Sequence, residues 1–474
     1  MNLQIDQFEL LDNVEELLSE INKYIKPKQK EKQENGEVFT PMNIVFELLD
    51  ALDADYDKVN NKSIFTEADF KWLDPASGIG NFIIGVYLRL MCGLELQIPE
   101  YNIRKKHIIE NMLYMSEINK SNVLICKKIY NPYNYYKVNI YEGDTLELDV
   151  LNAWGLESKF DVILGNPPYN KGSIGCTRKK AAHKTNGKYE AIWPKFVAKS
   201  FSLLKHNGFL VFITPLSWLK YTHAMHSQLL EKQILWLKLW DNSKGLEKLN
   251  GKIPISLFIL QNCLNTEHKK TKILSEIKSR RLISLSMEYL DPRYSIPIAF
   301  HSIFNKLLAF IEKHNLQLEY KIKTIQSMGE KIKIPDKFDL SDMLAVDTYT
   351  IKEGILVKKA IGVHQDANKR KLIISNKSSF TGAFIDEGKL GLTGSWKSYI
   401  LGDNLELILQ LLSFRICNII SHYTKYKQDF LELDVYTFLP DIRKLGIIKI
   451  TEYEFYELLE LTQQEISQIE LCGV

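Results

Sequence analysis

The sequence predicts an α/β protein: an open, mostly parallel sheet with helices on both faces, followed by a C-terminal α+β domain. Two observations carry this prediction. Short apolar segments alternate with helix-like segments between residue 71 and about residue 262. Glycine, proline or acidic residues follow several of these apolar segments, where strands of such a sheet would end. The length of 474 residues, with 45% hydrophobic residues, is sufficient for two or three domains with sizeable cores.

Six apolar segments are expected to form the strands of the sheet: residues 72–74, 112–116, 138–142, 160–164, 209–214 and 255–260. A helix is expected over residues 81–92, directly after the first strand. Ahead of the sheet, Thr40 is expected to cap a helix with Pro41 in its first turn, because apolar residues recur at helical spacing from residue 44 onward.

Three domains are expected along the chain. Residues 1–35 carry an apolar stripe at helical spacing and are predicted to form an N-terminal helical extension. The α/β sheet domain spans residues 36–262, and a further domain spans residues 263–474. The boundary is placed near residue 262 because the pattern changes there to a Lys- and Arg-rich, helix-like stretch, followed by strands and turns.

Composition and charge exclude several classes of protein. The net charge is +3, but the last 24 residues hold six glutamates and no Lys or Arg, which leaves +9 on residues 1–450. Those last residues are expected to form an amphipathic helix with a solvated acidic face. No apolar segment reaches the roughly 18 residues of a membrane span, and the N-terminus lacks a basic signal region, so a cytoplasmic protein without membrane contact is expected. The six cysteines form no C-x-x-C pair, which predicts neither a zinc site nor a disulfide framework.

A glycine-containing turn follows the first predicted strand. It lies in the segment LDPASGIGNF, from Leu73 to Phe82, and a helix begins at about Asn81. Glycines let the backbone approach a ligand closely, and the first N–H groups of the helix can bind one. Such a turn is equally consistent with a strand–helix connection that binds nothing. Residue 83 is Ile, so the pattern is not the G-x-G-x-x-G of dinucleotide-binding sites.

Acidic residues follow the next two strands. Glu117 ends the second strand, where its carboxylate can accept hydrogen bonds from both hydroxyls of a ribose. Asp144 follows the third strand and can accept a hydrogen bond from an adenine amino group. Either acid alone is more often a solvated loop residue. Because three successive strand ends carry suitable groups, the sequence predicts a site for one adenosyl ligand.

The most informative motif follows the fourth strand. It consists of Asn166, Pro167, Pro168 and Tyr169, which combine a neutral amide, a rigid backbone and an aromatic ring. In an open α/β sheet, ligands bind outside the carboxyl ends of the strands, which is where this motif is expected to lie.

With these motifs, residues 36–262 resemble the S-adenosylmethionine-dependent N6-adenine DNA methyltransferases of the γ-type motif order, a family of restriction-modification methylases. The resemblance implies the Rossmann-like sheet of these enzymes, a methyltransferase catalytic domain over 36–262, and a target recognition domain that binds DNA over 263–474. It implies S-adenosyl-L-methionine as cofactor, bound by Thr40, Pro41, Asp74, Ala76, Gly78, Gly80, Glu117 and Asp144. It also implies Asn166, Pro167, Pro168 and Tyr169 as catalytic residues.

The residues of this motif permit direct methyl transfer to an amine. An exocyclic amine is a poor nucleophile because its lone pair is delocalised into the ring. The Asn166 side-chain oxygen and the Pro167 carbonyl can accept its hydrogens and favour a pyramidal nitrogen. Tyr169 would stack on an adenine that has been flipped out of the duplex. No metal or covalent intermediate is required, and none of the 14 prolines precedes a cysteine, unlike in cytosine-C5 methyltransferases.

Two basic segments are candidate contacts to double-stranded DNA. The segment directly after the motif has no acidic residue, and its cations are suited to neutralise phosphates; they are Lys171, Arg178, Lys179, Lys180, Lys184 and Lys188. The second segment consists of Lys369, Arg370 and Lys371, ahead of a strand-like run. Each segment is also consistent with a solvated surface.

Some questions stay open at the level of sequence. The family often provides a second aromatic residue to stack on the target base, yet residues 245–254 contain none. Protein-glutamine and RNA-base N-methyltransferases share the NPPY motif and are the alternative. They usually lack the large C-terminal extension and the N-terminal cofactor motif of the family, which corresponds here to GEVFTP at residues 36–41. The recognition sequence, the oligomeric state and the existence of a separate cognate restriction endonuclease are undetermined.

Overall fold

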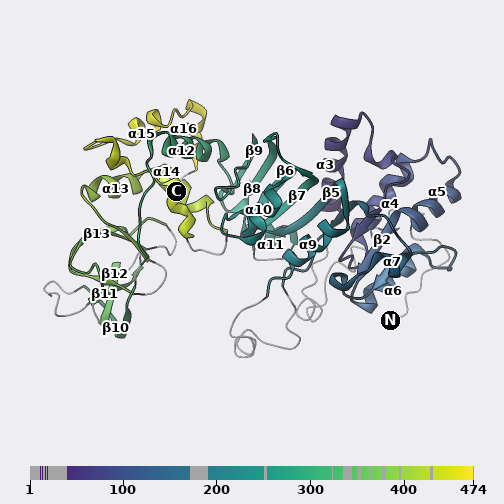
Figure 1. The fold of residues 1–474 in the computed structure, drawn as a ribbon, viewed down its shortest axis with the longest axis horizontal. Helices are drawn as coiled ribbons and strands as arrows, with labels where there is room; N and C mark the ends of the chain where they lie inside the picture. Colours follow the sequence, from purple (N-terminus) through teal and green to yellow (C-terminus); the bar gives the residue numbers. More distant parts are fainter. Residues whose placement is uncertain are drawn as a thin grey trace. The chain divides into compact units, whose positions relative to one another are not determined.

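The chain folds into two compact units in the computed structural model (Figure 1): unit 1 comprises residues 1–218 and 224–290, and unit 2 comprises residues 219–223 and 291–474. The structure describes residues 40–170, 190–249, 253–322, 324–334, 344–350, 354–361, 364–375, 379–393, 397–426 and 431–472, together with Leu11, Asn13, Glu16, Leu17 and Ser19. Most of the expected extension over residues 1–35 thus lies outside the described residues. Of this extension, Leu11 and Leu17 are buried.

Unit 1 is built on a nine-stranded sheet with the order β3-β2-β1-β4-β5-β7-β6-β8-β9. Its strands are β1 (Trp72–Asp74), β2 (Leu113–Glu117), β3 (Asn139–Glu142), β4 (Phe160–Gly165), β5 (Leu204–Pro215), β6 (Lys232–Trp240), β7 (Ile255–Leu264), β8 (Thr271–Ile277) and β9 (Leu282–Glu288). Strands β1 to β5 are parallel, and β7 runs antiparallel between β5 and β6. The open, mostly parallel α/β sheet expected from the sequence is confirmed.

Helices cover both faces of this sheet, and every residue of β1, β2 and β4 is therefore buried. The helices are α3 (Met42–Asn60), α4 (Asn81–Gly93), α5 (Tyr101–His107), α6 (Lys120–Tyr130), α7 (Val150–Trp154), α9 (Trp193–Leu203), α10 (Ala224–Leu230) and α11 (Asn242–Leu249). All six expected strands and the helix after the first strand are present. Strand β6 was not expected.

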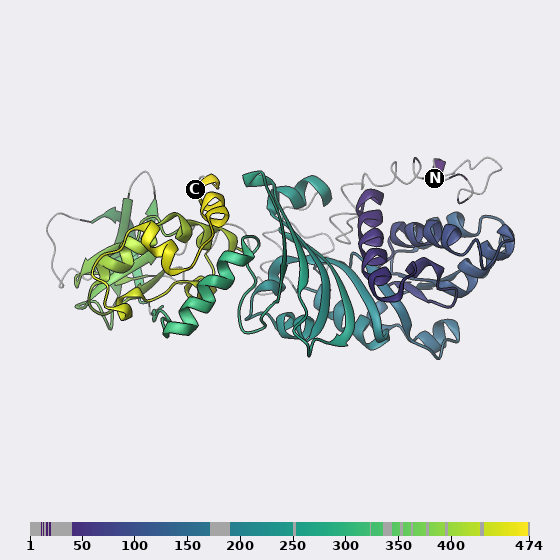
Figure 2. The ribbon, with the colours of Figure 1, turned by 90° about the horizontal axis from the view of Figure 1, so that it is seen from above.

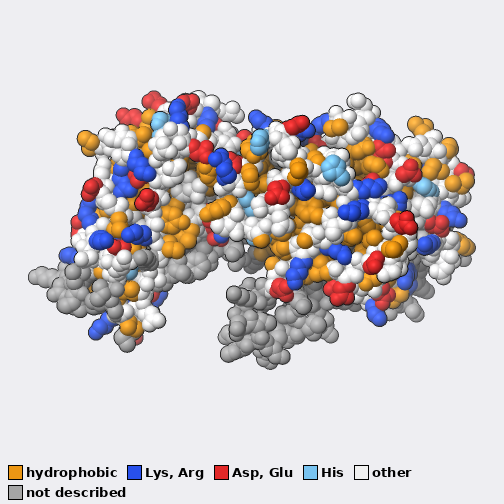
Figure 3. Space-filling model, in the orientation of Figure 1, with side chains coloured by type: hydrophobic (Ala, Val, Ile, Leu, Met, Phe, Trp, Pro, Cys, Tyr) orange, Lys and Arg blue, Asp and Glu red, His pale blue; other side chains and the backbone are white. Residues whose placement is uncertain are grey.

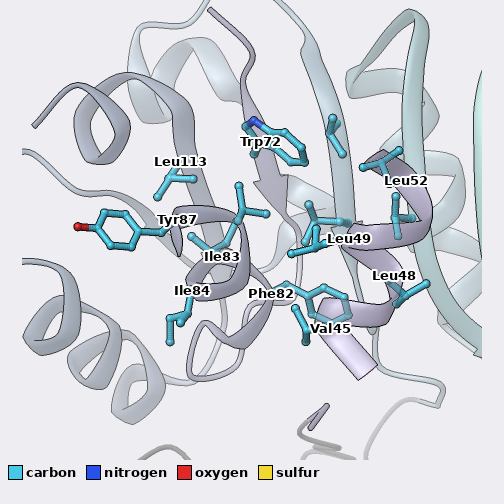
Figure 4. Packing of buried hydrophobic residues seen from close by; sticks show 14 of the residues in the cluster. Val45, Leu48, Leu49, Leu52, Trp72, Phe82, Ile83, Ile84, Tyr87 and Leu113 are labelled. Atoms are coloured by element: carbon cyan, nitrogen blue, oxygen red, sulfur yellow. The ribbon is translucent and has the colours of Figure 1, made fainter. Parts of the chain in front are cut away.

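The core of unit 1 packs α3 and α4 onto one face of the sheet (Figure 4). Val45 and Leu49 of α3 face α4, and Trp72 of β1 belongs to the same cluster. A Cβ atom on Gly85 of α4 would lie 2.7 Å from Val45 Cγ1, so the two helices approach as closely as only glycine allows. This packing holds the residue before α3 close to the start of α4.

The stretch after residue 262 was expected to be helix-like, and this expectation is wrong. Residues 271–277 and 282–288 form β8 and β9, which pair antiparallel, and β8 also pairs with β6 (Figure 2). On β9 the apolar Ile283, Leu285 and Met287 are exposed. The usual inward-facing apolar alternation is therefore reversed. Unit 1 extends to Leu290 because these two strands continue its sheet.

Unit 2 combines small sheets with helices. One sheet has the order β10-β12-β11-β15 and another β14-β13-β16. Their strands are β10 (Gln326–Lys333), β11 (Leu344–Thr350), β12 (Gly354–Ile361), β13 (Arg370–Ser375), β14 (Phe384–Glu387), β15 (Gly391–Leu392) and β16 (Lys397–Ile400). The helices are α12 (His301–His314), α13 (Leu405–Leu412), α14 (Arg415–Tyr423), α15 (Glu452–Leu458) and α16 (Gln463–Leu471).

The acidic C-terminal segment forms two helices instead of the single one expected. Thr451 with Glu454, and Thr462 with Glu465, each complete a capping box, so each helix has its own start signal. Among the described residues, no single helix is long and apolar enough to cross a membrane, and only α13 and α14, bent by 70°, meet that test as a pair.

Candidate active site

The predicted site residues follow the carboxyl ends of four neighbouring strands. Strands β3, β2, β1 and β4 are adjacent and parallel, so their carboxyl ends lie along one edge of the sheet. The chain order reverses between β1 and β4, which makes this point the switch point where such sheets bind ligands. Asp74 ends β1, Glu117 ends β2, and Asn166 directly follows β4.

Glu117 holds the glycine turn in place. Its Oε2 accepts a hydrogen bond from the Gly78 N–H at 2.7 Å, and its Oε1 accepts one from the Asn119 N–H at 2.7 Å. Gly78 and Gly80 have φ angles of 54° and 89°, in the left-handed region that favours glycine. A carboxylate offers about four lone-pair sites, so both oxygens retain capacity for a ligand's hydroxyl groups.

Asp74 is buried beneath this turn. Its Oδ1 accepts a hydrogen bond from the Ala76 N–H at 3.0 Å. Burial raises the pKa of the Asp74 carboxyl to about 8; the Ala76 bond lowers this pKa, and the negative charge of Glu117 raises it. Asp74 also lies close to the start of the catalytic motif, since a Cβ atom on Gly165, the residue before Asn166, would lie 2.7 Å from its Oδ1. The glycine ahead of Asn166 is therefore required for β1 and β4 to end side by side.

Asp144 caps the short 3-10 helix Thr145–Glu147, because its Oδ1 accepts a hydrogen bond from the Leu146 N–H at 2.9 Å. The Thr145 and Ser116 hydroxyls are 2.7 Å apart and join this loop to β2. Ile118, directly after Glu117, is 67% exposed. It was not predicted as a site residue, and an exposed apolar side chain at this edge is suited to pack against a planar ring.

Thr40 contacts the catalytic motif and does not cap α3. The N-cap of α3 is Pro41, and no side-chain cap is present, so the expected capping role of Thr40 is wrong. Its Oγ1 instead accepts a hydrogen bond from Asn166 Nδ2 at 3.3 Å, and its main-chain oxygen accepts one from Asn81 Nδ2 at 2.8 Å. Asn81 belongs to the segment singled out around the glycine turn, but the sequence did not predict it as a site residue.

Tyr169 packs its ring against the core cluster of unit 1, and burial raises the pKa of its hydroxyl. Its hydroxyl has no hydrogen-bond partner among the described residues. Its main-chain oxygen accepts a hydrogen bond from the Ile192 N–H at 3.0 Å, and Asn170 pairs with Ala191 as an antiparallel bridge. Residues 191 and 192 thus lie beside the end of the NPPY motif.

The expected DNA contacts have different outcomes. Lys171, Arg178, Lys179, Lys180, Lys184 and Lys188 lie outside the described residues. In unit 2, Lys371 is wrong as a DNA contact because its ammonium is buried and pairs with Asp386 at 2.5 Å.

Lys369 and Arg370 are at the surface of unit 2 but already have carboxylate partners. Lys369 pairs with Asp366 at 2.8 Å, and Arg370 pairs with Glu387 at 2.9 Å and also with Glu406. On the face drawn in Figure 3, cationic and acidic side chains are interspersed. No group of three or more His, Cys, Asp or Glu suited to a metal ion occurs in the part of the chain that the structure describes.

Comparison with known proteins agrees with this arrangement. Residues 86–243 match the model of the Eco57I restriction-modification methylase family. An uncharacterized adenine-specific methylase of Mycoplasma pneumoniae is 26% identical over 328 residues, which cover 52% of this chain and 74% of that protein. A type II methyltransferase of Thermus thermophilus is 39% identical over 80 residues, 14% of this chain and 18% of that enzyme.

Among solved structures, the restriction-modification enzyme MmeI in complex with DNA aligns with a TM-score of 0.47 and 12% identity, over 96% of this chain and 77% of that one. The matched family segment contains Glu117, Asp144 and the NPPY motif, whereas Thr40 and Asp74 precede it. The match of residues 86–243 to the Eco57I restriction-modification methylase model agrees with the family expected from the sequence.

Proposed function

We propose that this chain is an adenine-specific DNA methyltransferase of a restriction-modification system, which transfers a methyl group from S-adenosyl-L-methionine to the N6 amino group of adenine in duplex DNA. The observation that carries the proposal is the position of Asn166, Pro167, Pro168 and Tyr169, directly after β4 at the switch point of the sheet. The matched methylase family and the relatives named adenine-specific support it.

The residues at the strand ends fit the cofactor. The turn around Gly78 and Gly80 has positive φ angles and leads into the N-terminus of α4, which suits a close approach of the backbone to a ligand. Glu117 can accept hydrogen bonds from two ribose hydroxyls, and the exposed Ile118 can pack against an adenine ring. Thr40 and Pro41 would line the methionine end, with Asp144 at the adenine amino group.

S-adenosyl-L-methionine supplies an electrophilic methyl group when it is bound. The Asn166 side-chain oxygen and the Pro167 carbonyl accept the two hydrogens of the target amine and orient its lone pair towards that methyl group. Asp74 lies next to Gly165, the residue before this motif, and so limits where the motif can lie. Tyr169 provides a ring fixed by packing, on which the flipped adenine stacks. Fixed acceptors need no rearrangement during the reaction.

DNA binding is assigned to both units. The cations of residues 171–188 would neutralise phosphates, since they directly follow the NPPY motif in the sequence. Unit 2 would read the target sequence, with Lys369 and Arg370 as its phosphate contacts after exchange of their carboxylate partners. A restriction-modification role would pair this methylation with an endonuclease activity that cuts the same sequence when it is unmethylated.

The test is transfer of labelled methyl from S-adenosyl-L-methionine to unmethylated genomic DNA by the full chain, with long-read sequencing to locate the modified bases. We expect incorporation at adenine within one short sequence, abolished in Asn166→Ala. Asn152→Ala, which changes an exposed asparagine of unit 1, serves as the matched control and should be fully active. Label that enters RNA or protein, and not DNA, would move the assignment to the alternative N-methyltransferases.

A further inference from the structure

Thr40 lies at the junction of three segments that are distant in the sequence. It precedes α3, it contacts the first residue of α4, and it contacts the residue that follows β4. Thr40 and Asn81 are each only 4% exposed, so their mutual contact is protected from water, and the contact between Thr40 and Asn166 is partly buried. Leaving a buried hydrogen-bonding group unpaired costs free energy, so these contacts favour one position of the groups that they join.

The two hydrogen bonds form a chain. Asn81 Nδ2 donates to the Thr40 main-chain oxygen at 2.8 Å and fixes the position of that residue. Thr40 Oγ1 then accepts from Asn166 Nδ2 at 3.3 Å and holds the amino edge of the Asn166 carboxamide. The opposite edge of a carboxamide carries the oxygen, which is the group that must accept a hydrogen from the target amine.

We infer that Thr40 and Asn81 are positioning residues that set the orientation of the Asn166 carboxamide, and that they link the cofactor turn to the catalytic motif. This inference rests on the proposed function, because it assigns a role in that reaction. Asn81 directly follows Gly80, the last residue of the glycine turn, so the turn and the Asn166 side chain are joined through Thr40. Thr40 thus acts on methyl transfer in addition to lining the cofactor.

The first test replaces the Thr40 hydroxyl. Thr40→Val keeps the shape of the side chain but removes the hydrogen-bond acceptor. The Asn166 carboxamide then loses its fixed orientation, and kcat should fall by roughly 10- to 100-fold, since small misplacements of reacting groups have effects of this size. Thr40→Ser keeps the hydroxyl and should restore most of kcat. The dissociation constant for S-adenosyl-L-methionine, measured without DNA, should change much less than kcat in both variants.

The second test asks whether Asn81 acts on Asn166 through Thr40. Asn81→Ala should lower kcat as well, because Thr40 loses its anchor. In the Thr40→Val background the same substitution should have little further effect, since the two residues act through one contact.

Matched controls separate this effect from a loss of buried polar contacts in general. The Thr271 hydroxyl donates to the Ile234 main-chain oxygen at 2.7 Å, and Asn139 Nδ2 donates to the Glu110 main-chain oxygen at 2.9 Å; both residues are buried in unit 1. Thr271→Val and Asn139→Ala should lower the melting temperature as much as the test variants do and leave kcat unchanged.

The outcomes are distinct. A Thr40→Val enzyme with unchanged kcat and weakened cofactor binding would restrict Thr40 to lining the cofactor and overturn the inference, whereas the proposed function would stand. Equal loss of kcat in Thr40→Ser and Thr40→Val would also overturn it. If the unaltered chain transfers no methyl group to DNA, the proposed function itself fails.

Discussion

Replacing Gly165 by alanine tests the contact between Asp74 and the catalytic motif. The added Cβ would lie 2.7 Å from Asp74 Oδ1, 3.3 Å from Asp74 Cγ and 3.6 Å from Pro75 Cδ. Heavy atoms in contact prefer about 3.5–4.0 Å, so one side must move by about 0.8 Å. Asp74 is buried and bonded to the Ala76 N–H, which leaves it little freedom to move.

Overpacking of this kind costs about 1–3 kcal/mol of the free energy of unfolding. A displacement of Asn166 by close to 1 Å should also lower kcat by about 100-fold. Urea unfolding followed by tryptophan fluorescence measures the first effect in unit 1, because six of the seven tryptophans lie in residues 72–240. Methyl transfer to DNA measures the second effect.

Gly155→Ala is the control for backbone strain alone. Gly155 has a φ of 68° and no atom within 4 Å of its Cβ position, so the variant should lose about 1–2 kcal/mol and keep its kcat. Adding Asp74→Ala to Gly165→Ala should relieve the clash and give a coupling free energy of about 1–3 kcal/mol. A Gly165→Ala enzyme as stable and as active as the unaltered chain would refute this reasoning.

Three further predictions concern the two units. Burial raises the Asp74 pKa to about 8, whereas the pKa of Asp in an unfolded chain is about 4, so between about pH 4 and pH 8 native unit 1 binds more protons than the unfolded chain. The free energy of unfolding should therefore fall as pH rises through this window. Asp74→Asn should flatten this pH dependence in urea titrations, and an unchanged slope would contradict the assignment. Tyr169→Phe keeps the stacking ring and should stay active, whereas Tyr169→Ala should lose about 1–3 kcal/mol of stacking, seen as reduced kcat/KM; equal activity of the two would exclude stacking. Lys371→Gln leaves buried Asp386 without its cationic partner, so it should destabilise unit 2 by about 3–5 kcal/mol and leave the salt dependence of DNA binding unchanged. Lys369→Gln should instead lower the slope of DNA affinity against salt concentration by about 1. The reverse pattern would make Lys371 the phosphate contact.

The sequence alone determined the parts of this protein that depend on local pattern. Apolar segments of strand length, a glycine turn and the NPPY motif each occupy a short window, so their order predicted the sheet and its ligand edge. Strands β8 and β9 were missed because the Lys- and Arg-rich composition of this stretch was interpreted as helix-like. On β9 the apolar Ile283 and Leu285 also face solvent instead of the core.

Contacts between distant segments were decided only by the tertiary structure. Thr40 matches a capping pattern, yet its hydroxyl bonds to Asn166, 126 residues away, because α3 packs against α4 beside the end of β4. Lys371 matches a basic cluster, yet it is buried against Asp386 across the β13–β14 pair. Gly165 is required only because β1 and β4, far apart in the chain, end side by side at Asp74. Local propensity acts within a few residues, whereas burial, pairing of charges and close approach depend on which segments meet after folding.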